Sequence, residues 1–246
     1  MDPIPHWRGR PVEAVLLDLD GTLLDTADDI SAVLNQALAD RRLGALSTDA
    51  VRKLIGRGAP SLVGRALQLL GTPAQEVDVE TMLGRFCTHY EQLYAGDGGN
   101  AAPFPGVVEG LQALHDAGLK VAVVTNKQRR FALQLLRRLD LARWIDVVVG
   151  GDTSGQRKPD PRPLHFACEE LQVSPVRALM VGDSATDVLA ARAARIPVVC
   201  VPYGYNEGLD ASTLDCDALI QSLAELPALL GAGRHGGMAP SSMAPR

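Results

Sequence analysis

The sequence predicts an α/β fold: a Rossmann-like, doubly wound parallel sheet with an inserted α-helical cap. Short apolar runs alternate with helix-patterned segments along most of the chain, which is typical of a parallel sheet covered by helices on both faces. One stretch near the N-terminus lacks such runs and shows helical periodicity only. With 246 residues, the chain is long enough for one such domain and a smaller insertion.

Five apolar runs are the expected strands. The first covers residues 12–17, is broken only by Glu13 and stops at Asp18. Continuous apolar runs of this length are typical of parallel strands that are buried on both faces. The other expected strands cover residues 121–124, 146–149, 178–181 and 198–201.

The expected cap covers residues 26–100, and the catalytic core covers residues 11–25 and 101–230. Linkers near Asp25 and Ala101 would let the cap open for substrate and close to exclude water. Residues 1–10 and 231–246 are expected to be flexible termini, the latter because the segment is too small and polar to pack. The helical spacing of the cap is clearest at Leu62, Val63, Ala66, Leu67 and Leu70.

The composition and net charge indicate which kinds of partner the protein does not bind. The net charge is -5, and no basic stripe could neutralise nucleic-acid phosphates. No segment approaches the roughly 20 apolar residues needed to cross a bilayer, and no apolar leader opens the chain. The four cysteines form no C-x-x-C pair, which favours the reducing cytoplasm. We therefore expect no nucleic-acid or membrane partner, and either a monomer or a homodimer.

Polar residues follow three of the apolar runs, at the carboxyl ends where open parallel sheets bind ligands. Asp18 and Asp20 follow the first run and face the same side, because strand residues two apart do so. An Asp-x-Asp-Gly segment is also common in calcium loops, but Leu23 and Leu24 stand where such a loop needs oxygen ligands. The other polar ends carry Thr125 with Asn126, and Asp183.

The types of these residues suit phosphoryl transfer. Thr125 and Asn126 can donate hydrogen bonds to phosphate oxygens, or can simply cap a helix. Four carboxylates at two strand ends would repel one another without a cation, and their hard oxygen atoms suit Mg²⁺. A nucleophile, charge neutralisation and an acid for the leaving oxygen are thereby available. The four carboxylates are Asp18, Asp20, Asp183 and Asp187, and a lysine held by a following proline is Lys158.

The ordered motifs resemble those of haloacid dehalogenase superfamily phosphatases, over about residues 12–230. These motifs are Asp18-x-Asp20-Gly21-Thr22, Thr125-Asn126, Lys158-Pro159 and Gly182-Asp183-x-x-x-Asp187. Within that superfamily the chain is most similar to bacterial phosphoglycolate phosphatases. The segments that support this are Ile55-Gly56-Arg57-Gly58-Ala59, Val124-Thr125-Asn126-Lys127, Val149-Gly150-Gly151-Asp152 and Tyr203-Gly204-Tyr205-Asn206-Glu207-Gly208.

The resemblance implies a mechanism for a small phosphorylated metabolite. Asp18 would attack phosphorus and form an aspartyl phosphate, while Asp20 would act first as acid and then as base. Mg²⁺ would be bound by Asp18, the backbone carbonyl of Asp20 and Asp183, with Asp187 acting through water.

The resemblance also implies the residues that bind substrate. Thr125 and Asn126 would bind the phosphoryl oxygens, and Lys158 would offset negative charge. For a glycolate carboxylate, the cap loop offers Arg57 as a bidentate donor.

Other activities share these motifs. A related phosphatase could act on another small phosphate, such as a sugar phosphate of the N-acetylmuramate 6-phosphate type. Dehalogenation uses an aspartate without metal, and Asp20 with the Asp183 and Asp187 pair argues against it. A phosphomutase would pass the phosphoryl group to a sugar hydroxyl instead of water. A non-enzymatic receiver-like module would lack the helical insertion.

Overall fold

A six-stranded parallel sheet forms the centre of the protein in the computed structural model, which describes residues 5–72, 78–95 and 98–231. Its strand order is β10-β9-β8-β3-β6-β7. The predicted fold class is confirmed, and five strands coincide with the five apolar runs. The sixth strand, β10, was not predicted, because two residues are too short to show a hydrophobic periodicity. The strands are β3 (Ala14–Leu17), β6 (Lys120–Val124), β7 (Val147–Val149), β8 (Ala178–Gly182), β9 (Val198–Cys200) and β10 (Ala218–Leu219).

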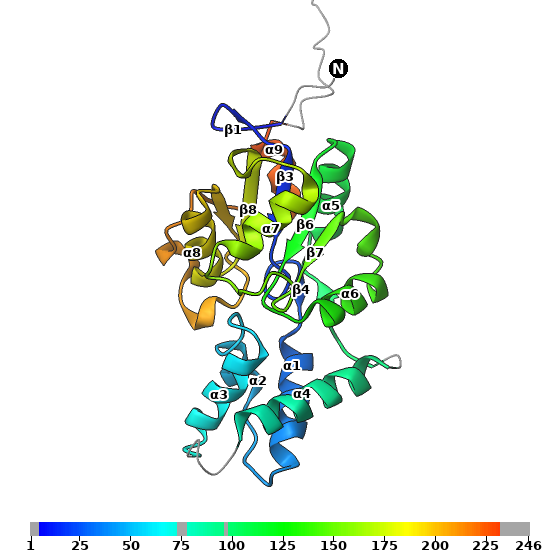
Figure 1. Cartoon of the computed structure of the whole chain (residues 1–246), viewed down its shortest axis with the longest axis vertical. Coiled ribbons are helices and arrows are strands. Elements are labelled where there is room, and N and C mark those ends of the chain that lie inside the picture. The colour runs from blue at the N-terminus through cyan, green and yellow to red at the C-terminus, as the bar shows by residue number, and fades with distance from the viewer. Residues whose placement is uncertain (1–4, 73–77, 96–97, 232–246) are drawn as a thin grey trace, which may run out of the picture.

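Helices cover both faces of this sheet (Figure 1). Successive strand side chains point to opposite faces, so Val15 and Leu17 belong to one apolar cluster and Ala14 and Leu16 to the other. The first cluster includes α5 (Val107–Asp116) and α6 (Arg129–Arg138). The second includes α7 (Arg162–Leu171) and α8 (Ala185–Ala194). The apolar runs are thus the interior of the core.

Short elements connect the core. Helix α9 (Leu226–Leu229) packs against α5. Within the described residues, five 3₁₀ turns complete the connections: η1 (Ala142–Trp144), η2 (Pro175–Arg177), η3 (Asn206–Gly208), η4 (Ala211–Thr213) and η5 (Leu223–Glu225).

A helical unit is inserted after the first core strand and lies beyond the carboxyl ends of the sheet (Figure 1). The chain enters it through β4 (Leu24–Asp25) and returns through β5 (Ala102–Pro103). These strands are antiparallel, with Asp25 opposite Ala102, so the two linkers lie side by side. The helices of this unit, which we call the cap, are α1 (Ala27–Ala39), α2 (Thr48–Arg52), α3 (Ala59–Leu69) and α4 (Val79–Tyr94).

Asp29 connects the returning linker to the first cap helix through hydrogen bonds. Its carboxylate is buried and accepts hydrogen bonds from the backbone N–H of Asn100 at 2.6 Å and of Ala101 at 2.9 Å. The hydroxyl of Tyr94, at the end of α4, donates to the same carboxylate. One buried acid therefore fixes the start and the end of the cap relative to each other.

The N-terminal segment differs from the sequence expectation. Residues 1–10 were expected to be flexible, but β1 (His6–Trp7) and β2 (Arg10–Pro11) form an antiparallel hairpin. The Trp7 ring is only 5% exposed and joins the core, and burial of so large an aromatic surface holds the hairpin in place. Residues 1–4 and 232–246 lie outside the described residues. Among the described helices, none is long and apolar enough to cross a membrane.

Candidate active site

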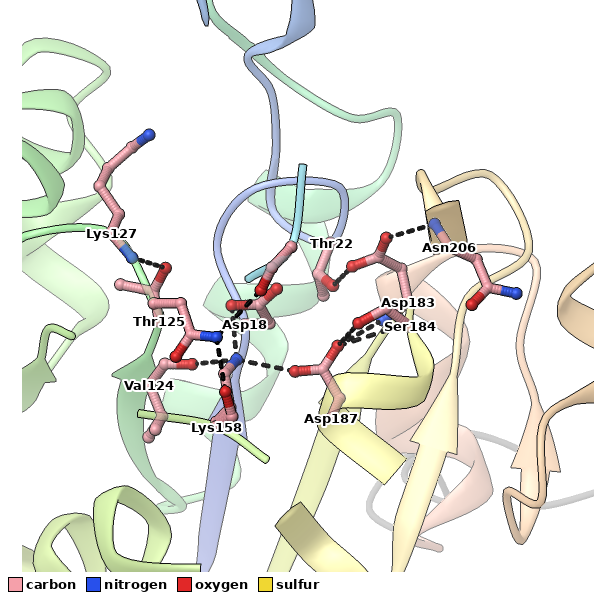
Figure 2. A network of polar contacts seen from close by, with 12 residues as sticks. Asp18, Thr22, Val124, Thr125, Lys127, Lys158, Asp183, Ser184, Asp187 and Asn206 are labelled. Atoms are coloured by element: carbon pink, nitrogen blue, oxygen red, sulfur yellow. Dashed lines mark hydrogen bonds and ion pairs between the residues drawn. The ribbon is translucent and has the colours of Figure 1, made fainter. Parts of the chain in front are cut away.

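Asp18 stands at the carboxyl end of β3, between the ends of its two neighbours β6 and β8. The buried ammonium of Lys158 lies 2.7 Å from Asp18 Oδ1 and 2.7 Å from Asp187 Oδ1. The same ammonium donates to the carbonyl of Val124 at 2.6 Å. Figure 2 shows Lys158 bridging the two carboxylates. The structure thus brings together a lysine and two aspartates that are far apart in the sequence.

Asp187 has both carboxylate oxygens occupied by donors of the protein. Helix α8 begins at Ser184 with a capping box, in which Asp187 Oδ2 accepts from the Ser184 hydroxyl at 2.8 Å and from its backbone N–H at 3.2 Å. The backbone N–H of Asp183 donates to the same oxygen at 3.3 Å. Lys158 binds the other oxygen. Asp187 is therefore a fixed structural anchor for the lysine.

Asp183 is held by donors from two loops. Its Oδ1 accepts from the Thr22 hydroxyl at 3.0 Å, and its Oδ2 accepts from the backbone N–H of Asn206 at 3.4 Å (Figure 2). The backbone N–H of Tyr205 also donates to Oδ2, at 2.7 Å. Gly21, with φ +94°, allows the first of these loops to approach, since a Cβ there would lie 2.5 Å from Asp183 Oδ2. Only glycine fits this close approach at that backbone angle.

The site carries more negative than positive charge. One ligand atom from each of Asp18, Asp183 and Asp187 lies within 4.8 Å of the others, and all three residues are buried. Burial raises the pKa of Asp18, although Lys158 offsets part of this rise. Burial and the nearby Asp187 raise the pKa of Asp183 to about 7. Burial disfavours the charged form of Lys158, but Asp18 and Asp187 outweigh this effect and raise its pKa.

These observations fit a divalent cation. Three carboxylates face a single ammonium, so at least one negative charge has no protein counterion within the cluster. All the available side-chain ligands are hard oxygen atoms, which Mg²⁺ prefers. The donor set of Asp18 and Asp183 therefore suits such an ion chemically.

The carboxylate of Asp20 is directed elsewhere. It is not part of the cluster of three aspartates. Its Oδ1 accepts from the Thr26 hydroxyl at 2.6 Å and forms an ion pair with Lys127 Nζ at 2.9 Å. This side chain lines a cavity between core and cap, next to Asp18. The Asp20 carboxylate is thus directed toward the cavity and Lys127 rather than toward the carboxylate cluster.

Thr125 and Asn126 follow β6 and also line this cavity. The backbone N–H of Lys127 donates to the Thr125 hydroxyl at 3.1 Å. The Asn126 amide donates at 2.9 Å to the carbonyls of both Gly56 and Lys158. Asn126 therefore connects a cap loop to the loop of the buried lysine.

The cavity is polar beside the strand ends, and its remaining lining from the cap and from α6 is mainly apolar. Asp18 and Asp20 lie at the polar end, beside the ends of β3 and β6. The apolar lining consists of Ile30, Ile55, Leu62, Phe86 and Phe131, and Tyr90 adds an aromatic ring with a hydroxyl.

Arg57 is not among the residues that line the cavity. Its side chain is 57% exposed and paired with Glu207, whose Oε2 accepts from Arg57 Nη2 at 3.0 Å. Arg65 pairs with the same carboxylate at 3.3 Å. The expectation that Arg57 faces the substrate is not met, because the charge of Glu207 holds the guanidinium at the outer rim between cap and core.

Sequence reasoning assigned no individual role to Lys127, Tyr203 or Tyr205. The Tyr205 hydroxyl accepts from the backbone N–H of Thr26 at 2.7 Å and donates to Asp25 at 2.8 Å. The Tyr203 hydroxyl donates to the carbonyl of Thr22 at 3.0 Å. These tyrosines lie just beyond β9. Their position directly after a predicted core strand was the one sequence feature that could have indicated a role at the site. They hold the loop that carries the aspartates.

Comparison with known proteins assigns the family. Residues 15–201 match the model of the haloacid dehalogenase-like hydrolase family. A phosphoglycolate phosphatase from Nitrosospira multiformis is 44% identical, covering 89% of this chain and 96% of the relative. A plasmid-encoded phosphoglycolate phosphatase from Cupriavidus necator is 46% identical, covering 91% and 95%.

Solved structures agree with this assignment. A predicted phosphoglycolate phosphatase from Haemophilus somnus superposes with a TM-score of 0.80 at 28% identity, covering 89% of this chain and 97% of the other. CbbY from Rhodobacter sphaeroides, in complex with phosphate, has a TM-score of 0.76 at 26% identity, covering 89% and 99%. The chain belongs to the haloacid dehalogenase-like hydrolase family.

Proposed function

We propose that the protein is a Mg²⁺-dependent phosphatase that hydrolyses 2-phosphoglycolate through a phosphorylated Asp18. The observation that carries this proposal is the buried contact of Lys158 with Asp18 and Asp187, beside Asp183 at the end of the cavity. Relatives at 44% and 46% identity are named phosphoglycolate phosphatases, which supports the choice of substrate.

In the first step, a carboxylate oxygen of Asp18 forms a bond to phosphorus, and the bond from phosphorus to the glycolate oxygen breaks. Asp20 donates its proton to that leaving oxygen, so the product departs as an alcohol. Lys158 orients the nucleophile through Oδ1. Thr125 and Asn126 line the same end of the cavity and would bind the phosphoryl oxygens. Asn126 would do so through its backbone N–H, because its side-chain amide already donates two hydrogen bonds.

In the second step, water attacks phosphorus and the bond to Asp18 breaks. Asp20 now accepts a proton from the attacking water and returns to its acid form. Phosphate leaves and Asp18 is regenerated. One acid–base residue beside the nucleophile thus serves both steps, and the Asp20 side chain lines the cavity in a position suited to this.

Mg²⁺ would be held by Asp18, Asp183 and the backbone carbonyl of Asp20. When bound, the ion would neutralise charge on the transferring phosphoryl group. Asp187 already accepts hydrogen bonds on both oxygens. We therefore assign Asp187 to holding Lys158 in place and, at most, to an indirect contact with the ion.

The lining of the cavity favours a small leaving group over a sugar. Beyond the phosphoryl end it is formed mainly by aliphatic and phenyl side chains, which offer no partners for hydroxyl groups. The polar side chains there are those of Lys127, Gln128 and Tyr90, too few to pair with every hydroxyl group of a sugar. A buried sugar hydroxyl without a hydrogen-bond partner costs about 1–3 kcal/mol. The same argument disfavours a phosphomutase that acts on sugars. An N-acetylmuramate 6-phosphate type of substrate is the second candidate, because related phosphatases share the core motifs.

The cellular setting is part of the proposal. Cysteines at positions 87, 168, 200 and 216 are all free thiols, which supports a reducing, cytoplasmic environment. Either a monomer or a homodimer is compatible with a cavity built from one chain.

The test is phosphate release from 2-phosphoglycolate, glucose 6-phosphate and N-acetylmuramate 6-phosphate, with Mg²⁺ or with a chelator. We expect the highest kcat/KM for 2-phosphoglycolate and loss of turnover in the chelator. A higher kcat/KM for either sugar phosphate would keep the mechanism and change the substrate. Turnover that persists in the chelator would contradict the metal-dependent mechanism.

A further inference from the structure

We infer that Lys127 receives the carboxylate of the substrate, with the Tyr90 hydroxyl as a second donor. This inference rests on the proposed function and assigns the residues that select a carboxylated substrate. Both residues line the cavity. They replace Arg57, which the structure holds against Glu207 at the rim.

The position of Lys127 follows from the chemistry of the leaving group. In 2-phosphoglycolate, one methylene separates the leaving oxygen from the carboxylate carbon. Asp20 must reach the leaving oxygen to protonate it, so the substrate carboxylate lies within a few bonds of Asp20. Lys127 Nζ is 2.9 Å from Asp20 Oδ1. The Lys127 ammonium therefore already lies in the region where the substrate carboxylate must bind.

Lys127 is the only cationic side chain among the described residues that line this cavity. It is 8% exposed, so its charge acts with little screening by water. The side chain extends away from the buried aspartates and from Lys158 (Figure 2). Lys158 is already bound to Asp18 and Asp187. The two cations are thus separated, one for the phosphoryl end and one for the other end of the substrate.

The Tyr90 hydroxyl is a buried hydrogen-bond donor that a ligand in the cavity could use. Tyr90 is 1% exposed, and its hydroxyl has no partner in good hydrogen-bond geometry among the described residues, although the nearby Tyr94 hydroxyl acts to lower its pKa. Its ring lies 4.6 Å from that of Phe131 and 5.0 Å from that of Tyr94, centroid to centroid, and Lys127 Nζ lies 4.9 Å from its centroid. Burial and the charge of Asp20 raise the pKa of Tyr90, so the hydroxyl keeps its proton. A carboxylate held between ammonium and phenol would satisfy both donors.

The remaining lining strengthens this selection. Ile30, Ile55 and Phe86 contribute apolar side chains to the same cavity. In such surroundings a charged hydrogen bond is stronger than in water. An alkyl phosphate without a carboxylate would leave the Tyr90 hydroxyl unpaired, so the pocket favours ligands that carry a second acidic group.

Binding of two phosphonates tests the inference without turnover. In 3-phosphonopropionate a methylene replaces the leaving oxygen of 2-phosphoglycolate, and propylphosphonate lacks only the carboxylate. Calorimetry with Mg²⁺ gives the ratio of their affinities for wild type, Lys127→Met, Lys127→Arg and Tyr90→Phe. We expect wild type to prefer 3-phosphonopropionate. Lys127→Met should reduce this preference by about 10- to 100-fold and Tyr90→Phe by about 3- to 10-fold, as expected for charged and neutral hydrogen bonds.

Lys127→Arg should retain most of the preference, because it keeps the charge. Tyr90→Phe keeps the ring and its packing, so it provides a variant whose folding is not at risk. Equal loss of affinity for both phosphonates in Lys127→Met, or an unchanged ratio in both Lys127→Met and Tyr90→Phe, would overturn the inference.

The failure of this inference is distinguishable from failure of the proposed function. If wild type turns over 2-phosphoglycolate selectively while the variants keep the wild-type affinity ratio, the carboxylate site lies elsewhere. If wild type prefers a sugar phosphate and binds both phosphonates equally, both the substrate assignment and the proposed carboxylate site are wrong.

Discussion

Lys158 Nζ lies 2.7 Å from Oδ1 of Asp18 and is almost fully buried beneath it. The same nitrogen is anchored by Asp187 at the first turn of α8. One ammonium therefore orients the proposed nucleophile and fixes it to a neighbouring strand end. The hydrogen bond to the Val124 carbonyl completes the set of three acceptors. This arrangement leads to predictions on stability and on catalysis together.

Lys158→Met removes the charge but retains most of the side-chain volume. Asp18 and Asp187 would then remain buried without their counterion, at a cost of about 3–5 kcal/mol in the free energy of unfolding. Phosphate release should fall by at least about 100-fold, because charge neutralisation near the phosphoryl group is lost. Urea unfolding and steady-state kinetics measure the two effects. Lys53→Met, at an exposed cap position, is the matched control, and a similar result for both variants would contradict the role of Lys158.

The stability of the metal-free protein should depend on pH in an unusual direction. Burial and Asp187 raise the pKa of Asp183 from its ordinary 3.8 to about 7. Between these values the folded state binds a proton that the unfolded state has lost, so the free energy of unfolding decreases as pH rises. In a chelator, the Tm should therefore fall between about pH 4 and pH 7 through the contribution of this group.

Mg²⁺ should reverse this trend, since its binding requires deprotonated carboxylates and stabilises the folded state. The rise in Tm on adding Mg²⁺ should be larger at pH 8 than at pH 5. Thermal unfolding at both pH values, with Mg²⁺ or chelator, measures this difference. A Mg²⁺ effect that is the same at both pH values would contradict the placement of the ion among these carboxylates.

Gly21→Ala tests the close approach to Asp183. The added Cβ would lie 2.5 Å from Asp183 Oδ2, and the backbone has φ +94°. Alanine at such an angle costs about 1 kcal/mol or more, and the clash should also displace the carboxylate. We expect at least a tenfold rise in the Mg²⁺ concentration that gives half-maximal activity. Gly118, with φ +70° and open space around it, is the matched control: Gly118→Ala should cost stability alone. Equal Mg²⁺ requirements in both variants would be evidence against the proposed site.

Arg57→Ala should leave the KM for 2-phosphoglycolate within about twofold of wild type, because the side chain is exposed and bound to Glu207. Glu207→Gln should have a similarly small effect, since both variants disrupt the same pair at the rim. Initial-rate kinetics on both variants provide the check. A tenfold rise in KM for Arg57→Ala, without a matching effect of Glu207→Gln, would restore Arg57 as a substrate ligand.

The core could be predicted because its signals are local. Each long apolar run forms a strand, and residues at neighbouring strand ends must meet in space, so Asp18 and Asp183 could be grouped from the sequence alone. β10 and the hairpin around Trp7 were not predicted. A strand of two residues is too short to show a hydrophobic alternation, and one buried aromatic ring does not form a sequence pattern.

The substrate end of the site could not be predicted in the same way. The direction of Arg57 is set by Glu207, which lies 150 positions further along the chain. Lys127 and Asp20 follow the neighbouring strands β6 and β3, so their proximity could be expected, but the direction of each side chain within its loop could not. Such directions depend on tertiary packing, for which a single sequence offers no local signal.

The central claim is that Asp18 carries the phosphoryl group during turnover. Acid-quenched reactions of wild type and Asp18→Asn with 2-phosphoglycolate and Mg²⁺, followed by proteolysis and mass spectrometry, test it directly. We expect a phosphorylated peptide containing Asp18 in wild type, with no phosphorylation and no phosphate release in Asp18→Asn. Phosphate release by Asp18→Asn at a rate near that of wild type, or phosphorylation at another residue, would contradict it.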